Sequence, residues 1–126
     1  YINGKRWGEY IKWYPSGKLS KQGSYANGEK HGLWIGFHEN GEVSDTINYI
    51  FGDRFGRYVS YYDNGKIKYL ANYENDVKSG EVIHYDYDGE PQILLNYIED
   101  ELCSYAIPCQ NVLRFLVKCC YELLPV

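Results

Sequence analysis

A period of 24 residues runs through most of the chain and constrains its fold more than any other feature. The repeat is complete in the stretch 25–48, which reads Y-A-N-G-E-K-H-G-L-W-I-G-F-H-E-N-G-E-V-S-D-T-I-N. Three columns keep the spacing without insertion or deletion: Tyr1, Tyr25, Tyr49, Tyr73 and Tyr97; Gly8, Gly32, Gly56 and Gly80; and Gly17, Gly41, Gly65 and Gly89. Another glycine column, Gly4, Gly28 and Gly52, changes to Asp76 and Asp100 in the last repeats. Such a period predicts a repeat architecture in which each unit contacts mainly its neighbours.

The composition favours a single β-rich domain. The chain has 126 residues, of which 15 are Tyr, and aromatic residues are typical of strands, where a flat ring covers a pleated surface. Its 17 acidic and 13 basic residues give a net charge of −4. This balance argues against a nucleic-acid partner held by phosphate attraction.

The cellular context is predicted from the cysteines and from the hydropathy pattern. No hydrophobic run reaches the roughly 18 residues that cross a bilayer, and no secretory signal precedes the first repeat. The four cysteines, Cys103, Cys109, Cys119 and Cys120, all follow the main run of repeats, so free thiols in a reducing compartment are the simpler interpretation. We therefore expect a cytoplasmic location. Because the chain starts at a repeat tyrosine and not at Met, we expect it to be a fragment or a processed form.

Each repeat is predicted to form one β-hairpin. In the second repeat, residues 33–38 and 42–49 are β-prone runs that flank the turn Glu39-Asn40-Gly41, and Asn27-Gly28 forms the turn between hairpins. Two turn geometries fit this pattern and pair the strands with different parity: a two-residue type I′ turn, or a three-residue loop with glycine in a G1 bulge. The fold class is therefore an all-β repeat, a single-layer antiparallel meander of about four to five hairpins.

We favour the bulged turn, because it is expected to place Ile35 and Phe37 on one face with Val43 and Ile47. By repetition, this predicted core face also holds Ile11, Trp13, Leu19, Val59, Tyr61, Ile67, Ala71, Ile83, Tyr85 and Leu95. A slip of one residue would mix these positions with polar ones, so burial should enforce the register.

The opposite face is predicted to be polar but rich in aromatic residues. It carries Tyr10, Lys12, Tyr14, Trp34, His38, Tyr58, Tyr62 and His84, with Ser20, Gln22, Ser44, Thr46, Asn48 and Asn72. Rings with a polar edge form a surface that a protein partner can cover. The predicted partner-binding residues on this face are Tyr10, Tyr14, Trp34, His38, Tyr58 and Tyr62. In the alternative interpretation, the tyrosines only stabilise exposed strands by cross-strand pairing.

The glycine column that opens each first strand, Gly8, Gly32, Gly56 and Gly80, is expected to let an aromatic ring lie over bare backbone. Tyr25, Tyr49 and Tyr73 are the expected rings. A Gly56→Val change should then disturb packing more than the same change at Ser60.

The end of the chain changes to a helical period over residues 110–124. Val112, Phe115, Leu116, Cys119 and Leu123 mark one helical face, and Arg114, Lys118 and Glu122 form a narrow polar stripe. We predict a C-terminal α-helix, either a cap on the sheet or a docking element for a partner, and count Phe115 and Leu116 among the partner-binding residues. The expected division is 1–102 for the repeat sheet and 103–126 for the helical tail.

One basic residue recurs in each repeat, in the column Arg6, Lys30, Arg54 and Lys78. Two strands per repeat place these cations about 9 to 10 Å apart, a spacing that suits anionic headgroups or an acidic partner. Acidic residues nearby, Glu9, Glu29, Asp53 and Glu81, favour the alternative of solvated turn charges.

The sequence carries no pattern that indicates catalysis or metal binding. The histidines His31, His38 and His84 lack ligand spacing, and the cysteines lack paired C-x-x-C spacing. Nucleophile-elbow, zinc-protease, P-loop and dinucleotide-binding motifs are missing from the sequence. We expect a protein that is not an enzyme and needs no cofactor and no metal.

The phased pattern Y-x-N-G-x-x-H-G-x-W, followed by E-N-G, resembles a MORN repeat, and most closely the variant found in bacterial YwqK-type antitoxins. The resemblance covers residues 1 to about 102. It implies a gutter-shaped antiparallel sheet that serves as a non-catalytic interaction scaffold, and an association of some MORN proteins with membrane phospholipid or cytoskeletal partners. The fourth repeat departs from the pattern, because it has Asp76 and Lys78-Ser79 where the second repeat has Gly28 and Lys30-His31.

These observations together predict a protein-interaction module that binds a protein partner and is antitoxin-like or immunity-like. The alternatives are a structural scaffold or spacer of a larger assembly, and a module that binds a phospholipid surface.

Overall fold

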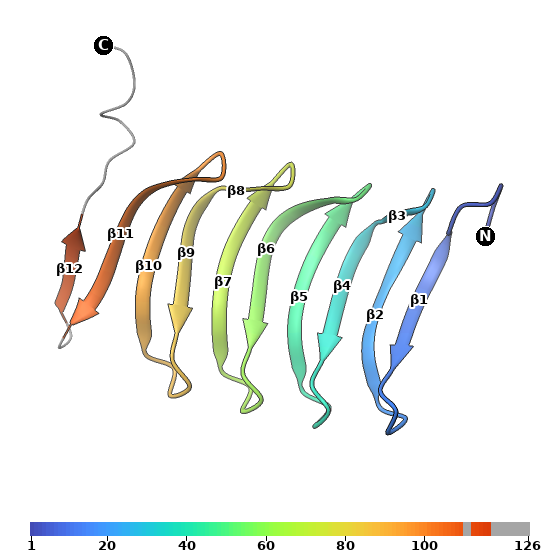
Figure 1. Cartoon of the computed structure of the whole chain (residues 1–126), viewed down its shortest axis with the longest axis horizontal. Coiled ribbons are helices and arrows are strands. Elements are labelled where there is room, and N and C mark those ends of the chain that lie inside the picture. The colour runs from blue at the N-terminus through green and yellow to red at the C-terminus, as the bar shows by residue number, and fades with distance from the viewer. Residues whose placement is uncertain (110–111, 117–126) are drawn as a thin grey trace, which may run out of the picture.

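The chain forms one antiparallel β-sheet (Figure 1). The computed structural model describes the backbone of residues 1–109 and 112–116 and the side chains of residues 1–105. The strands are β1 (Gly8–Trp13), β2 (Leu19–Ala26), β3 (Glu29–Lys30), β4 (Gly32–Phe37), β5 (Val43–Ile50), β6 (Asp53–Tyr61), β7 (Ile67–Glu74), β8 (Val77–Lys78), β9 (Gly80–Tyr85), β10 (Pro91–Ile98), β11 (Glu101–Cys109) and β12 (Val112–Leu116).

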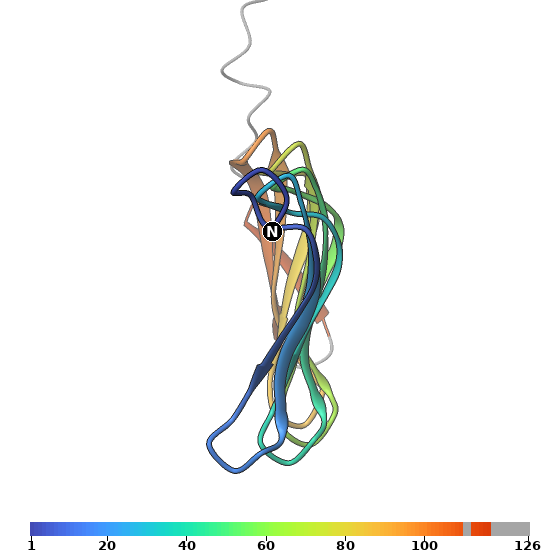
Figure 2. The same cartoon turned by 90° about the vertical axis from the view of Figure 1, so that its right-hand side faces the viewer.

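The strands follow one another across the sheet in chain order, β1-β2-β4-β5-β6-β7-β9-β10-β11-β12, while β3 pairs with β2 and β8 with β7. Figure 2 shows the sheet edge-on, as a single curved layer. The predicted all-β meander is confirmed. β1 and β12 lie at opposite ends of it.

The hairpin turns have the predicted three-residue form. The His38 amide donates to the Glu42 carbonyl at 2.8 Å, and the Gly41 amide donates to the His38 carbonyl at 3.0 Å. Gly41 has a φ of 90°, whereas Asn40 is not among the residues with positive φ. A type I′ turn needs positive φ at both central residues, so the G1 bulge is the correct alternative.

A second β-bulge, which the sequence pattern does not predict, follows each turn. Gly36 pairs with Asp45 and Phe37 with Val43, so Ser44 has no partner in β4. The same column is skipped in every hairpin, at Ser20, Ser44, Lys68 and Gln92. The extra residue interrupts the alternation of side chains. Residues separated by an even number along the second strand, such as Val43 and Ile47, therefore lie on opposite faces when the bulge stands between them.

Several residues consequently lie on the face of the sheet opposite to the predicted one. Ile47 pairs with Trp34, so it lies on the face that was predicted to be polar. Ala71 and Leu95 change sides in the same way, opposite Tyr58 and Val82. Trp34 is only 4% exposed and Ile47 5%, whereas Ile11 is 43% exposed. The predicted assignment of inside and outside is wrong, because parity was extrapolated through the bulge.

Two names describe the faces from here on. The aromatic face holds the core cluster and the rings around it: Trp34, Ile47, Ala71, Tyr73 and Val82, with Tyr10, Tyr25, Tyr49, Tyr58, Tyr69, Leu95 and Tyr97. The aliphatic face holds two rows: Ile11, Ile35, Val59 and Ile83, and Trp13, Phe37, Tyr61 and Tyr85.

The ring that lies over bare backbone is found at a different glycine from the predicted one. A Cβ atom built on Gly23 would overlap Cδ2 of Trp34, so the indole lies directly over this glycine. At Gly56 the same construction meets no atom within 4 Å, but φ is 76°. The column of Gly56 is therefore required by backbone conformation, and ring coverage occurs at Gly23 instead.

The predicted helix over residues 110–124 is wrong where the structure describes that segment. Val112–Leu116 forms strand β12, paired antiparallel with β11 between Tyr105 and Cys109. A short apolar run does not distinguish helix from buried strand, and the unpaired edge of a sheet is a template that favours the strand. Residues 110–111 and 117–124 of the predicted helix lie outside the described part. The expected boundary after residue 102 falls inside β11.

Candidate functional site

Four cations cover four tyrosines on the aromatic face. Each cation precedes its tyrosine by 19 residues: Arg6 Cζ lies 5.3 Å from the centroid of Tyr25, Lys30 Nζ 5.2 Å from Tyr49, Arg54 Cζ 4.3 Å from Tyr73, and Lys78 Nζ 5.0 Å from Tyr97. These are the cations that were predicted to meet an anionic ligand. The structure places their charged groups over rings, where the negative face of the ring attracts them.

Two of these cations also have polar partners. Arg54 Nε donates to Asp76 Oδ1 at 2.6 Å, in an ion pair whose side chains are 41% and 46% exposed. The Arg54 side chain and its backbone amide lower the pKa of Asp76, and the hydrogen bond to Asp76 raises the pKa of Arg54. Arg6 donates to the hydroxyls of Tyr1 at 3.2 Å and Tyr25 at 3.5 Å, which raises its pKa.

Three predicted partner-binding residues connect neighbouring hairpins instead. The Tyr14 hydroxyl donates to the Phe37 carbonyl at 2.5 Å, and the Tyr62 hydroxyl to the Tyr85 carbonyl at 2.7 Å. His38 Nε2 lies 2.9 Å from the Tyr61 carbonyl and donates to it, which assigns the proton to Nε2. Each side chain bonds a carbonyl 23 residues further along the chain. The repeat thus uses this column to fix one hairpin to the next.

The other predicted partner-binding residues on this face pack among themselves. The ring of Trp34 lies 5.3 Å from that of Tyr10, and its Nε1 donates to the Ser24 carbonyl at 3.1 Å. Tyr58 lies 5.6 Å from Tyr69 in an edge-to-face contact. Trp34 is buried beneath these rings, so little of its surface is left for a partner. Phe115 and Leu116 lie in β12, opposite Ala106 and Tyr105.

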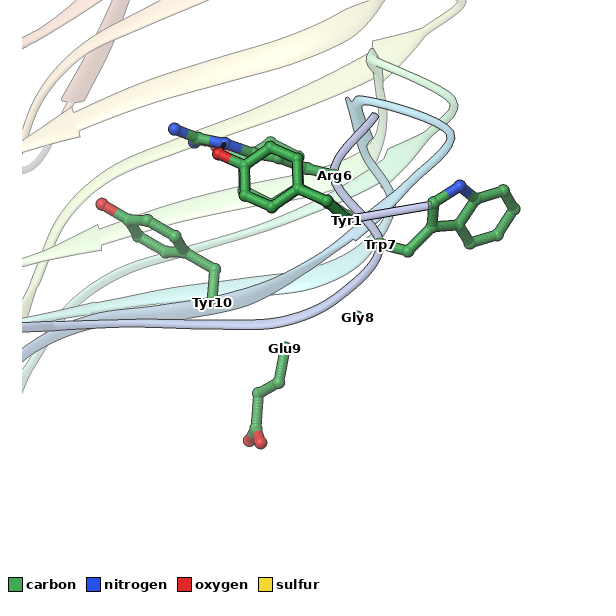
Figure 3. A pocket seen from close by; sticks show the side chains of 7 residues that line it. Tyr1, Arg6, Trp7, Gly8, Glu9 and Tyr10 are labelled. Atoms are coloured by element: carbon green, nitrogen blue, oxygen red, sulfur yellow. Dashed lines mark hydrogen bonds between the residues drawn. The ribbon is translucent and has the colours of Figure 1, made fainter. Parts of the chain in front are cut away.

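Two adjoining hollows open on the aromatic face near the start of the sheet. The first has a volume of about 350 Å³ and is lined by Tyr1, Arg6, Trp7, Gly8, Glu9, Tyr10 and Tyr25. Figure 3 shows Tyr1, Arg6 and Tyr10 on one side of β1, with the Glu9 carboxylate pointing away on the other. The second has a volume of about 240 Å³ and is lined by Tyr10, Lys12, Ser20, Lys21, Tyr25, Lys30 and Trp34. Tyr10 and Tyr25 belong to both hollows.

The second hollow contains residues that the sequence analysis did not choose as a site. Lys12 and Lys21 are directly opposite each other in β1 and β2. Lys12 lies on the same face as Tyr10, as predicted, and the structure adds Lys21 to it. The signal was present in the sequence, because the register of the hairpin determines which residue stands opposite Lys12. The pairing can be predicted only if the second bulge is known, because this bulge moves Lys21 into the position opposite Lys12.

The arrangement suits binding rather than proton transfer. Burial raises the pKa of Tyr49 and Tyr58, and raises the pKa of Tyr69 to about 12, so these hydroxyls stay protonated at neutral pH. No group of three or more histidine, cysteine or acidic residues in the described part of the chain is placed to hold a metal ion. A helix of the length and hydropathy needed to span a bilayer is not found among the described residues.

Comparison with known proteins identifies the repeat. The profile of the MORN repeat variant matches residues 8–27, 30–50 and 56–75, so residues 8–75 hold three such repeats. No curated protein matches the chain. Among solved structures, the chain is similar to one in the crystal structure of a GtfA/B complex bound to UDP and GlcNAc, with 13% sequence identity and a TM-score of 0.33. The match covers 88% of this chain and 24% of that one.

Proposed function

Because the chain carries repeats of the MORN variant, which are generally associated with protein or membrane-lipid interaction, we propose that it is a non-catalytic protein-interaction module that docks through its aliphatic face. The observation that supports this proposal is the single layer of the sheet. A β-sheet normally buries an apolar face against a second layer. Here the aromatic face forms the core cluster, and no second layer covers the aliphatic face within the described residues.

The aliphatic face has the composition of an interface centre. Its two central rows contain no charged residue, and Trp13 is 58% exposed. Charged side chains occur in the row beside them, at Glu9, Arg57 and Glu81. Apolar centres with a polar rim, rich in Trp and Tyr, are typical of protein interfaces. This distribution favours a partner that presents aliphatic or aromatic side chains.

An antitoxin-like role is the finer form of this proposal. It is supported by the resemblance of the repeats to those of YwqK-type proteins, and its partner would be a toxin. In the scaffold alternative the same face docks, but the partner is a structural component of a larger assembly. A captured partner that arrests growth when expressed alone, and is neutralised by this chain, would support the antitoxin form.

The test compares two isoleucines that differ only in where they lie. Ile11→Ser removes an apolar side chain from the aliphatic face, and Ile2→Ser removes one from the exposed segment before β1. A partner captured with the wild-type chain and then purified should bind the Ile11→Ser variant at least about tenfold more weakly. Binding to Ile2→Ser should be unchanged. Equal binding by both variants and the wild type would exclude the aliphatic face as the docking surface.

A further inference from the structure

A pair of like charges marks the second hollow as a separate site. Lys12 and Lys21 are directly opposite each other on β1 and β2, and both side chains line this hollow on the aromatic face. Like charges in directly opposite positions destabilise a sheet. The equivalent pairs in later repeats are Gly36 with Asp45, Ser60 with Tyr69, and His84 with Ile93. The fold therefore does not require two cations at this position.

A third cation reaches the same hollow from the second repeat. Lys30 Nζ lies 4.7 Å from the ring centroid of Trp34 and 5.2 Å from that of Tyr49, which holds the ammonium in place without neutralising it. The residues that line the hollow include no aspartate and no glutamate. Three lysines thus line one small volume.

No ion pair in the described part of the chain involves these lysines. The one ion pair found there joins Arg54 to Asp76. Asp45 is the acidic residue on this face closest in register, because it pairs with Gly36, which in turn pairs with Lys21. The carboxylate of Asp45 lies over Gly36 and accepts a hydrogen bond from the Ser44 hydroxyl at 2.8 Å, so one acidic group stands beside the hollow but does not line it. The Glu9 carboxylate points to the other side of β1 (Figure 3).

We propose that Lys12, Lys21 and Lys30 bind the phosphate group of a phosphate monoester. A phosphate offers several acceptor oxygens and up to two negative charges, which match three ammonium donors and the Ser20 hydroxyl that also lines the hollow. The volume of about 240 Å³ is below the roughly 300–1,000 Å³ of pockets that bury a drug-sized ligand. The hollow therefore takes the phosphate, and the remainder of the ligand lies over Tyr10 and Tyr25, toward the first hollow.

This site is independent of the docking proposal, since it lies on the opposite face of the sheet. Two sources supply the same chemistry, a soluble phosphorylated metabolite and the headgroup of an anionic lipid. Glycerol phosphate serves as the soluble probe. Phosphatidylcholine vesicles with and without phosphatidic acid serve as the lipid probe, because phosphatidic acid carries the same monoester.

The experiment measures binding of both probes to the full chain by calorimetry, at low and high salt. The wild type should bind at least one probe, and binding should weaken at high salt. Lys12→Gln and Lys21→Gln should each reduce the affinity about tenfold. Lys18→Gln makes the same charge change in the adjacent turn, outside the hollow, and should leave the affinity unchanged.

The ligand-free variants provide a second readout. Because the two lysines repel each other, Lys12→Gln should unfold at the same or a higher temperature than the wild type, while losing the thermal shift that the probe produces. Binding of glycerol phosphate supports a soluble ligand, and binding of phosphatidic acid vesicles alone supports a lipid. The proposal is overturned if neither probe binds, or if Lys12→Gln loses no more affinity than Lys18→Gln. It is also overturned if a glutamate-rich peptide binds through these lysines and neither probe does.

Discussion

Two glycines, Gly23 in β2 and Gly56 in β6, are required for different physical reasons. At Gly23 there is no space for a side chain, because the indole of Trp34 lies where a Cβ atom would stand. At Gly56 the space is open, but the backbone has the left-handed conformation that side chains disfavour. The two cases are distinguished by which substitutions each position tolerates.

Gly23→Ala should destabilise the protein by about 1–3 kcal/mol, because the added methyl group must displace a buried ring. The expected result is a lower urea midpoint and a changed near-ultraviolet signal from the tryptophans. Ser24→Ala, at an exposed neighbour in the same strand, is the control and should leave both unchanged. A Gly23→Ala protein as stable as the wild type would mean that Trp34 does not lie over this glycine in solution.

At position 56 the order of stability should be Gly, then Asn, then Val. Asn tolerates the left-handed region, whereas a β-branched side chain there adds to a cost of about 1–2 kcal/mol for an ordinary residue. Thermal melts of the Gly56→Asn, Gly56→Val and Ser60→Val variants test this order, and Gly56→Val should be the least stable of the three. If Asn and Val destabilise equally at position 56, crowding and not φ is responsible.

At the scale of the hairpin, asparagines at the turns connect each repeat to the next. Asn40 Nδ2 donates to the Asp63 carbonyl at 2.8 Å, and Asn64 Nδ2 donates to the Tyr87 carbonyl at 2.9 Å. The first hairpin has Ser16 in this column, whose shorter side chain carries no amide donor. By repetition, the acceptor that an asparagine at position 16 would meet is the Glu39 carbonyl.

Ser16→Asn should therefore stabilise the protein by about 0.5–1.5 kcal/mol, the net contribution of one hydrogen bond. Asn40→Asp should destabilise it by a similar amount, because the carboxylate keeps the acceptor for the Glu42 amide but loses the donor. Urea unfolding measures both changes, with Ser16→Ala as the control for loss of the serine. A Ser16→Asn protein no more stable than Ser16→Ala would contradict the proposed connection.

Sequence reasoning succeeded for the hairpins and their turns because these depend on local chemistry. The turn requires a left-handed backbone conformation at Gly41, which glycine adopts whatever surrounds it. The recurrence of glycine at this position every 24 residues is enough to predict the meander. The faces were assigned wrongly because the bulge at Ser44 leaves no strong mark in composition: its column holds Ser20, Ser44, Lys68 and Gln92. The strand Val112–Leu116 was read as helix because its apolar run fits both periods, and only the neighbouring edge of β11 decides between them.

For the whole molecule, a single-layer sheet must obtain its stability along one face. The cluster from Trp34 to Val82 extends across β4 to β9, and the cation column continues it toward both ends. The sequence predicted the column but not its role, because a period shows that cations recur without showing what lies beneath them. The hollow at Lys12 and Lys21 occurs in one repeat, so the period does not indicate it, and the two lysines stand opposite each other only because of the bulge at Ser20.

Because the tyrosines of this face are partly buried together, the sheet as a whole should be sensitive to alkali. Burial raises the pKa of Tyr69 from 10.0 to about 12 in the folded state. Below pH 10 the hydroxyl is neutral in both states and contributes no pH dependence. Between about pH 10 and 12 the unfolded chain releases a proton that the folded chain retains, so stability falls as pH rises. Burial raises the pKa of Tyr49 and Tyr58 as well, which adds to the loss in the same direction.

Tyr69→Phe keeps the ring and removes the ionisable hydroxyl, so its urea midpoint should fall less than that of the wild type between about pH 9 and 11. Tyr61→Phe removes one hydroxyl from the aliphatic face and is the matched control, which should follow the wild type. If all three proteins lose the same stability, Tyr69 ionises equally in the folded and unfolded states. The aromatic face would then be open to water, and the burial that holds the single layer together would have to lie on the other side of the sheet.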